Sequence, residues 1–252
     1  MIIKNLLIKK STFILIILCF ITGLVKDLFA IYSLVLFHEV GHIIISLIYK
    51  WNISRVEVYP FGAITIYDDK IDKPLKEELI ITIMGPIFQI ILFYIYLYLN
   101  NKYIISDYFF SLVKNYHYSI LIFNLIPIVP LDGSKIINII FNKIFCFKKS
   151  YIFLLFISIM NMLIFIIINI NNTSYVLIIS FLISEIIKYY KNKDYIFNRF
   201  ILEKYLYKNN YKKYIKINNI YKMKRNKKHL IKYNDNYISE INAIKKIKEY
   251  NS

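Results

Sequence analysis

Two histidines and a glutamate stand at a spacing that suits metal chemistry. The run FHEVGH at residues 37–42 contains an HExxH pattern. On an α-helix, His38 and His42 are four residues apart and project from one face, where two imidazole nitrogens can bind one Zn²⁺. Glu39 follows the first histidine and can take a proton from a metal-bound water. The pattern therefore predicts a catalytic zinc site.

A third ligand must come from elsewhere, because a catalytic zinc usually has three protein ligands and one open position. The candidate is Asp132, in an N-x-x-P-x-x-P-L-D-G run that begins at Asn124. A carboxylate next to an apolar run is costly without a function. Pro127 and Pro130 interrupt the helix before it and let the chain turn back toward the metal.

These two motifs together resemble the signatures of the site-2 protease family, the zinc intramembrane metalloproteases. The resemblance implies that one Zn²⁺ per chain is bound by His38, His42 and Asp132. It also implies that Glu39 is the catalytic glutamate. The expected reaction is the hydrolysis of a peptide bond in or near the membrane.

Other segments support the resemblance and suggest where a substrate binds. Residues 54–67 alternate partly between apolar and polar, which predicts a short hairpin similar to the membrane-associated hairpin of that family. Gly85-Pro86 resembles the family's GP motif. An exposed strand edge in the hairpin can pair with an extended peptide. The resemblance implies substrate contacts from the following residues: Asn124, Pro130, Phe61 and Gly62.

The composition is that of an α-helical polytopic membrane protein. Of the 252 residues 58% are hydrophobic, the mean hydropathy is +0.48, and the apolar residues come in long blocks. Hydropathy predicts about six spans, at residues 11–25, 28–49, 79–99, 109–130, 151–170 and 174–190. Basic residues flank these spans at the N-terminus, at residues 134–150 and in the C-terminal segment. Both termini are therefore expected in the cytoplasm.

Two more polar residues lie inside the predicted spans. Gln89 in the third span is expected to form a hydrogen bond between helices, with no direct part in the chemistry. His117 in the fourth span has no motif partner, and its role stays open.

The formal net charge of +17 is concentrated near the C-terminus, where residues 188–252 hold 18 lysines and arginines against five acidic residues. Residues 1–190 are expected to form the intramembrane metalloprotease domain, and residues 191–252 a short basic cytoplasmic tail. Such a tail can bind anionic lipid head groups. Nucleic-acid binding is not expected, because the chain has no recognisable motif for it.

The compact core without a PDZ-sized insertion resembles the stage IV sporulation protease subgroup. Members of that subgroup lie in the membrane around the forespore and remove the pro-sequence of a sigma-factor precursor. The resemblance implies such a substrate and inhibitory membrane partner proteins. Members usually end in paired CBS repeats, and about 60 residues are too few for a pair. The tail is therefore expected to be a linker or a truncated CBS-like module.

Two alternatives stay open. In the first, the protease is directed at an anti-sigma factor or a signal-peptide remnant, since the recognition elements lie in the substrate. A zinc-binding membrane protein without proteolysis, such as a transporter, is the other. Transporters usually place polar residues across several spans, whereas here they gather around two motifs.

Overall fold

The computed structural model describes residues 3–60, 62–170, 175–207, 211, 214–233 and 236–250. The chain forms two compact units. Unit 1 contains Met1–Asp69 and Leu79–Leu125, and unit 2 contains Lys70–Glu78 and Ile126–Ser252.

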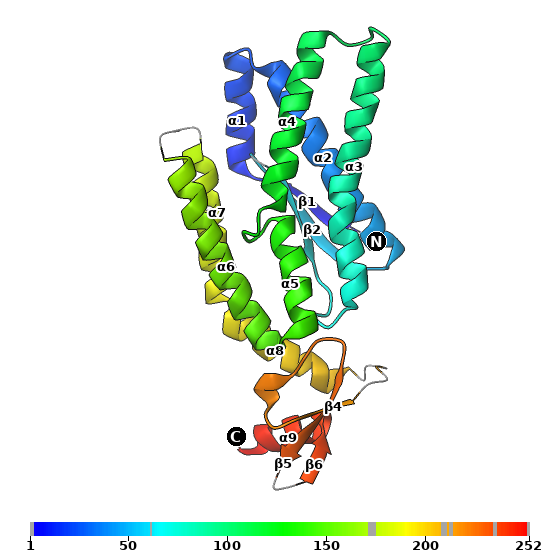
Figure 1. Cartoon of the computed structure of the whole chain (residues 1–252), viewed down its shortest axis with the longest axis vertical. Helices are drawn as coiled ribbons and strands as arrows, with labels where there is room; N and C mark the ends of the chain where they lie inside the picture. The colour runs from blue at the N-terminus through cyan, green and yellow to red at the C-terminus, as the bar shows by residue number, and fades with distance from the viewer. Residues whose placement is uncertain are drawn as a thin grey trace. The chain divides into compact units, whose positions relative to one another are not determined.

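The described part of unit 1 combines apolar helices with one small sheet (Figure 1). In chain order its elements are β1 (Ile3–Ile8), α1 (Lys10–Ile21), α2 (Val25–Ile48), β2 (Ile53–Tyr59), β3 (Gly62–Tyr67), α3 (Leu75–Asn101) and α4 (Asp107–Leu125). The first turn of α3 belongs to unit 2. Long runs of leucine and isoleucine suit helices here, because a helix pairs its own backbone polar groups, as a membrane requires.

The sheet of unit 1 has the strand order β1-β2-β3, with β1 parallel to β2 and β2 antiparallel to β3. Val56 and Val58 of β2 are buried, and the Thr12 hydroxyl of α1 donates to the Val58 carbonyl at 2.9 Å. The strand β1 is absent from the sequence-based expectation. Its register pairs Ile3 with Ile53, a partner so distant along the chain that no local pattern signals it.

Small residues let the helices of unit 1 approach closely. A Cβ added at Gly41 of α2 would lie 3.0 Å from the Phe88 Cβ of α3 and would overlap with the Met84 carbonyl. Ala30 and Leu34 of α2 are fully buried in a core that also contains Val113 of α4, and α2 runs beside α4 (Figure 1). This packing presents one face of α2 to both α3 and α4.

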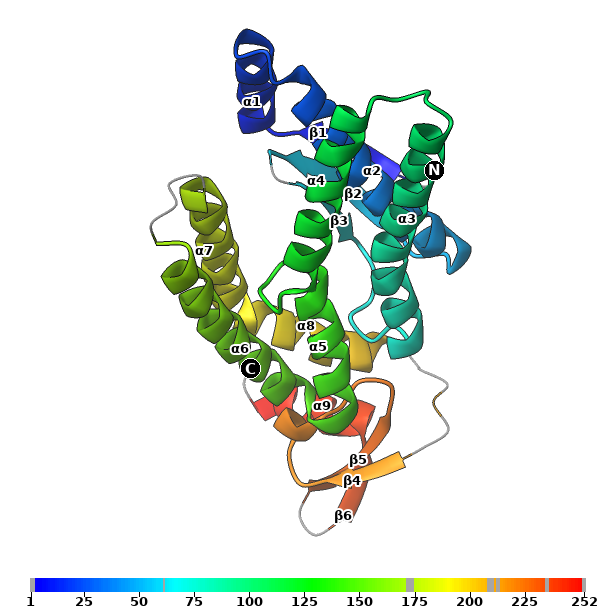
Figure 2. The same ribbon diagram turned by 45° about the horizontal axis from the view of Figure 1, so that its top comes forward.

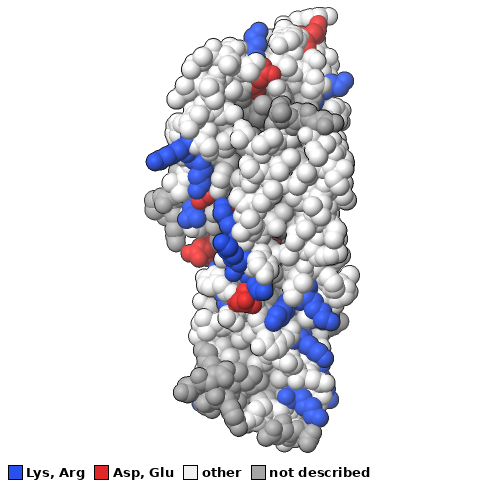
Figure 3. Space-filling view, turned by 90° about the vertical axis from the view of Figure 1, so that its left-hand side faces the viewer, with Lys and Arg blue, Asp and Glu red and all other residues white. Residues whose placement is uncertain are grey.

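Among the described residues, three helices are long and apolar enough to cross a membrane: α2, α3 and α6 (Phe147–Ile168). The helix α1 is apolar but shorter. Helices also occupy the expected fourth and sixth positions, as α4 and α7 (Val176–Lys191), so the count of six spans stays a prediction. On the face shown in Figure 3, a wide area has neither basic nor acidic side chains, as a lipid-facing surface needs.

The described elements of unit 2 are helices followed by a second small sheet. They are α5 (Asp132–Ile144), α6, α7, α8 (Lys193–Leu206), β4 (Tyr214–Ile217), η2 (Ile220–Lys222), β5 (Lys228–Tyr233), β6 (Asn236–Ser239) and α9 (Glu240–Tyr250). The expected span at 109–130 is interrupted, because α4 ends at Leu125 and α5 begins at Asp132. Pro127 and Pro130 lie between them, where proline excludes a continuous helix.

The C-terminal segment is folded around its own core. β4 lies parallel to β5, and β5 antiparallel to β6 (Figure 2). The core residues are Phe147, Phe197, Phe200, Ile217, Ile220, Met223, Ile231, Ala243 and Ile244. Apolar side chains from α6 and α8 thus complete a sheet that has too few residues to bury a core alone.

Candidate metal centre

The two histidines of the HExxH motif meet on the buried face of α2. His38 and His42 are 5% and 3% exposed, and their Nε2 atoms lie 3.2 Å apart. The four-residue spacing on a helix produces this geometry, as the sequence predicts. Two ring nitrogens therefore face one point inside unit 1.

The outer nitrogen of each ring contacts an oxygen. His38 Nδ1 lies 3.0 Å from Gln89 Oε1, and His42 Nδ1 lies 2.8 Å from the Ile81 carbonyl. Oxygens of this kind only accept, so both Nδ1 atoms have the proton and both Nε2 atoms present lone pairs. Two lone pairs at 3.2 Å repel one another unless a cation lies near both. The pair thus fits a metal ion, and imidazole nitrogen suits zinc.

The space beside the His38 and His42 rings depends on Gly85 of α3. A Cβ added at Gly85 of α3 would overlap with the His42 ring and would lie 2.7 Å from His38 Nε2. A Gly-Pro pair in a membrane helix suggests close packing against a neighbouring helix, and the structure adds a second role for Gly85. The missing side chain leaves room beside the two metal-facing nitrogens.

Glu39 is buried and has a hydrogen-bonding partner on the sheet. The carboxylate is 6% exposed, and its Oε1 accepts a hydrogen bond from the Thr65 hydroxyl of β3. Sequence reasoning missed Thr65, since nothing in an alternating strand marks one threonine as special. Its bond to Oε1 leaves Oε2 of Glu39 to accept a proton.

Asp132 lies in unit 2, in the first turn of α5, and is 4% exposed. The positive end of the helix dipole favours a carboxylate there. Lys135, one turn later, forms an ion pair with Asp132 at 2.9 Å. His38, His42 and Asp132 are all buried in their own units, and histidine and aspartate are residue types that zinc accepts as ligands.

The residues expected to contact the substrate are spread over both units. Asn124, near the end of α4, and Gly62, at the start of β3, are half-buried in unit 1. Pro130, also half-buried, follows a cis peptide bond in unit 2. Phe61 lies outside the described residues.

Gln89 and His117 have clear partners. Gln89 is fully buried on α3, and its Nε2 donates to the His117 carbonyl of α4 at 2.9 Å. The expected interhelical hydrogen bond is present. Its second partner is His38, which the sequence did not indicate.

Charged groups outside the spans stabilise the sheet of unit 1. The buried carboxylate of Glu57 contacts Lys9 at 2.9 Å and Arg55 at 2.8 Å, and the Tyr59 hydroxyl donates to it at 2.7 Å. Burial raises the pKa of Glu57, but hydrogen bonds from Tyr59 and Lys9 and the charges of Lys9 and Arg55 outweigh it. The net pKa lies below its usual value of 4.5.

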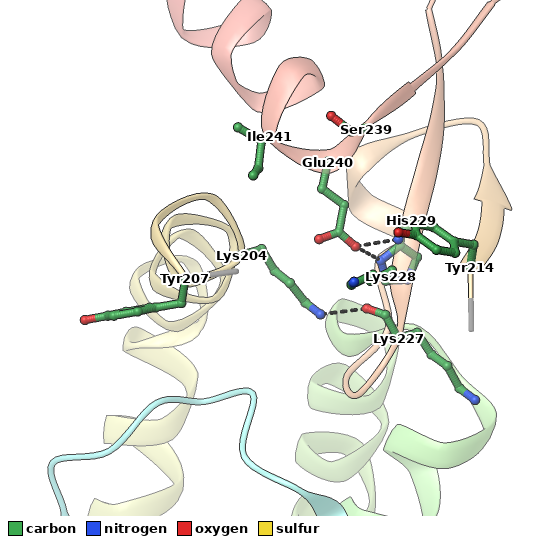
Figure 4. A pocket seen from close by; sticks show the side chains of 9 residues that line it. All are labelled: Lys204, Tyr207, Tyr214, Lys227, Lys228, His229, Ser239, Glu240 and Ile241. Atoms are coloured by element: carbon green, nitrogen blue, oxygen red, sulfur yellow. Dashed lines mark hydrogen bonds and ion pairs between the residues drawn. The ribbon is translucent and has the colours of Figure 1, made fainter. Parts of the chain in front are cut away.

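A cavity lies in unit 2, on the C-terminal sheet (Figure 4). It has a volume of about 270 Å³, and lysines and tyrosines line much of it. Here the buried His229 ring contacts Glu240 at 2.6 Å. Its position in a basic, polar stretch of sequence suggests a solvated side chain, and that expectation is wrong, because β5 turns His229 into the core at 1% exposure.

Comparisons with known proteins show which proteins this chain is similar to. Residues 27–119 match Peptidase family M50. The chain is 34% identical over 194 residues to Stage IV sporulation protein FB of Bacillus subtilis (strain 168), which covers 75% of this chain and 67% of that protein. It is 31% identical over 119 residues to a zinc metalloprotease of Methanocaldococcus jannaschii, covering 46% of this chain and 34% of that protein.

The fold is similar to that of a solved structure, the site-2 protease from Methanocaldococcus jannaschii. The TM-score is 0.59 at 21% identity, over 73% of this chain and 89% of that chain. The resemblance read from the two motifs is confirmed, and the apolar helices make the chain an integral membrane protein. With its HExxH helix, its buried donors and these relatives, the chain belongs to peptidase family M50, the membrane zinc metallopeptidases.

Proposed function

We propose that the chain hydrolyses a peptide bond in or near the membrane with one zinc ion, bound by His38, His42 and Asp132. The observation that carries the proposal is the pair of Nε2 lone pairs 3.2 Å apart, with both Nδ1 atoms engaged elsewhere. Asp132 supplies the third ligand, because a catalytic zinc site needs three ligands and one open position. Burial of the Asp132 carboxylate supports this role.

Glu39 acts as the general base in this proposal. Bound zinc supplies Lewis acidity to a water and to the scissile carbonyl. Oε2 of Glu39 takes the proton of the attacking water and then gives it to the leaving amine. Thr65 holds the other oxygen, so the carboxylate keeps one orientation through both transfers.

Substrate binding uses the edge of the first sheet. β3 is an edge strand of the order β1-β2-β3, and an extended peptide can add to such an edge through backbone hydrogen bonds. Asn124, Pro130, Phe61 and Gly62 contact the substrate in this proposal. An extended substrate exposes its peptide bonds, whereas a helical one shields them.

The proposed substrate is the precursor of a sporulation sigma factor. Similarity to a stage IV sporulation protein supports this choice. The proposal places both termini in the cytoplasm, six spans in the membrane around the forespore, and inhibitory partner proteins beside them. Residues 1–190 form the protease domain, and the basic residues of 191–252 bind anionic lipid head groups.

The experiment that tests the function compares the native chain with Glu39→Gln. Each is co-expressed with a sigma-factor precursor in a heterologous bacterium, and the precursor size and the zinc content are measured. Glu39→Gln should bind zinc and lose roughly 10²- to 10⁴-fold in cleavage. Undiminished cleavage by this variant would refute the role of Glu39.

The substrate is tested in the same cells. A native chain that binds zinc, leaves the precursor intact and cuts an anti-sigma factor or a signal-peptide remnant would overturn the proposed substrate and leave the chemistry standing. A zinc-loaded chain that cuts none of these substrates would point to a zinc-binding protein without proteolysis.

A further inference from the structure

Gln89 connects three helices of unit 1 through one side chain. It lies on α3 with 0% exposure. Its Oε1 contacts His38 Nδ1 of α2 at 3.0 Å, and its Nε2 donates to the His117 carbonyl of α4 at 2.9 Å. Both ends of the Gln89 amide are therefore hydrogen-bonded: its oxygen to a histidine ring of α2 and its NH₂ group to a backbone carbonyl of α4.

The orientation of this amide is determined by its partner on α4. A carbonyl oxygen cannot donate, so the group that faces His117 must be the NH₂ group of Gln89. A second, longer contact joins Nε2 to the His117 ring nitrogen Nδ1 at 3.4 Å. The His117 ring is itself stacked on Phe93, with centroids 4.3 Å apart and planes at 13°. The carbonyl oxygen of Gln89 must therefore point toward His38.

That oxygen determines the tautomer of His38. Because Oε1 only accepts, it requires the proton of the imidazole on Nδ1, which leaves Nε2 unprotonated. Nε2 is the atom that faces His42. A histidine ligand binds metal through an unprotonated nitrogen, and the hydrogen bond at the other nitrogen sets its orientation.

We propose that Gln89 is a positioning residue for the metal site: it holds His38 in the tautomer and ring orientation that present Nε2 to zinc, while the backbone carbonyl of His117 orients the amide of Gln89. The inference rests on the proposed zinc function. It also gives His117 a role, which is to supply a backbone acceptor and a stacked ring, with no direct contact with substrate.

Two substitutions separate this role from general packing. Gln89→Met keeps an unbranched side chain and removes the acceptor for His38. Gln89→Glu keeps an acceptor, since a carboxylate also accepts from Nδ1–H. We expect Gln89→Met to lower zinc affinity by about 10- to 100-fold, a usual loss for a partner of a ligating histidine. Gln89→Glu should recover part of that loss, because it keeps the acceptor for His38 but lacks the NH₂ group that donates to the His117 carbonyl.

A matched control is available on the same pair of helices. The Tyr96 hydroxyl of α3 donates to Ser33 Oγ of α2 at 2.9 Å. Tyr96→Phe removes this partly buried hydrogen bond between α2 and α3 and leaves His38 untouched. We expect its zinc affinity to equal that of the native chain.

The measurement is zinc retention by the full chain in detergent, titrated with a chelator, together with the visible spectrum of the Co²⁺-loaded protein. The Gln89→Met spectrum should change, because an altered His38 changes the coordination. Equal zinc retention by native protein and Gln89→Met would overturn the inference, and so would equal losses in Gln89→Met and Tyr96→Phe. A native chain that binds no zinc would instead refute the proposed function.

Discussion

Replacing Lys204 by methionine should release residues 70–78 from the C-terminal part of unit 2. The Lys204 ammonium contacts Asp72 Oδ2 at 2.7 Å and donates to the Lys227 carbonyl at 2.8 Å. The side chains of Lys204 and Asp72 are only 1% and 2% exposed. Lys204→Met would keep the length of the side chain and remove the buried cation.

The expected magnitude follows from the burial of this pair. Removing one partner of a buried ion pair costs about 3 to 5 kcal/mol, because it leaves the other charge uncompensated. Asp72 keeps a hydrogen bond from the Asn226 backbone N–H at 2.8 Å, which favours the lower half of that range. Since 1.4 kcal/mol is a factor of ten, a loss of about 3 to 4 kcal/mol should make local opening roughly 100- to 700-fold more frequent.

Amide hydrogen exchange of the full chain in detergent measures this opening directly. Two backbone amides report on the contact: that of Ile71, which donates to Glu203 at 2.6 Å, and that of Asn226. Both should exchange roughly 100- to 700-fold faster in Lys204→Met. Adding Asp72→Asn removes the uncompensated charge, keeps an acceptor for Asn226 and should restore most of the protection.

An exposed ion pair provides the control. Lys188, one turn after Glu185 on α7, is 59% exposed and pairs with it. Such pairs contribute about 0 to 1 kcal/mol, so Lys188→Met should leave exchange at residues 70–78 unchanged. Equal exchange in native protein and Lys204→Met would refute the claim that the buried pair fastens this segment.

Three further predictions concern unit 1. Gly85→Ala places a methyl group against the His42 ring, so zinc content after dialysis should fall by about 10-fold or more, and unchanged content would contradict the need for glycine. Thr65→Val removes the hydrogen bond to Glu39; kcat should fall by about 10- to 100-fold, as expected for a lost bond of about 1.5 to 3 kcal/mol to a charged group, and Thr65→Ser should recover it. The lowered pKa of Glu57 means that its ionised form stabilises the folded sheet above pH 4.5, and that this contribution disappears as the pH falls through the lower folded value. Thermal denaturation of native protein and Glu57→Gln should therefore differ near neutral pH and converge in acid, whereas a constant difference would argue against the ion cluster.

The sequence predicts well the part of the candidate metal centre that lies on the single helix α2. His38, Glu39 and His42 are neighbours on one helix, so a four-residue spacing suffices to place both imidazoles on one face. The break before Asp132 is also readable, because Pro127 and Pro130 stand three residues apart and each would remove a backbone hydrogen bond from a continuous helix.

The contacts that sequence reasoning missed join residues far apart along the chain. Gln89 can be recognised in the sequence as a polar residue in an apolar helix, but its partner His38 lies 51 residues away and cannot be identified in this way. Thr65 and Glu39 are 26 residues apart. Periodicity reports which face of an element is apolar and contains no information about which side chains meet across two elements.

For the C-terminal segment, the sequence left a linker and a truncated CBS-like module open, and composition explains why it could not separate them. Many lysines and asparagines in this segment mask a sparse apolar pattern, and its core needs Phe147, a residue of α6. A window confined to the tail therefore shows too little hydrophobicity for a packed unit.

The attachment of residues 70–78 has a consequence for sequence variation among relatives. Two ion pairs attach this segment: Asp72 pairs with Lys204 at 2.7 Å, and Glu78 pairs with Arg225 at 2.8 Å. A substitution on one side leaves a buried charge on the other, so the two positions of each pair should change together during evolution. An alignment of close homologues should show this covariation, and homologues with an unrelated C-terminal segment should have lost both acids at once.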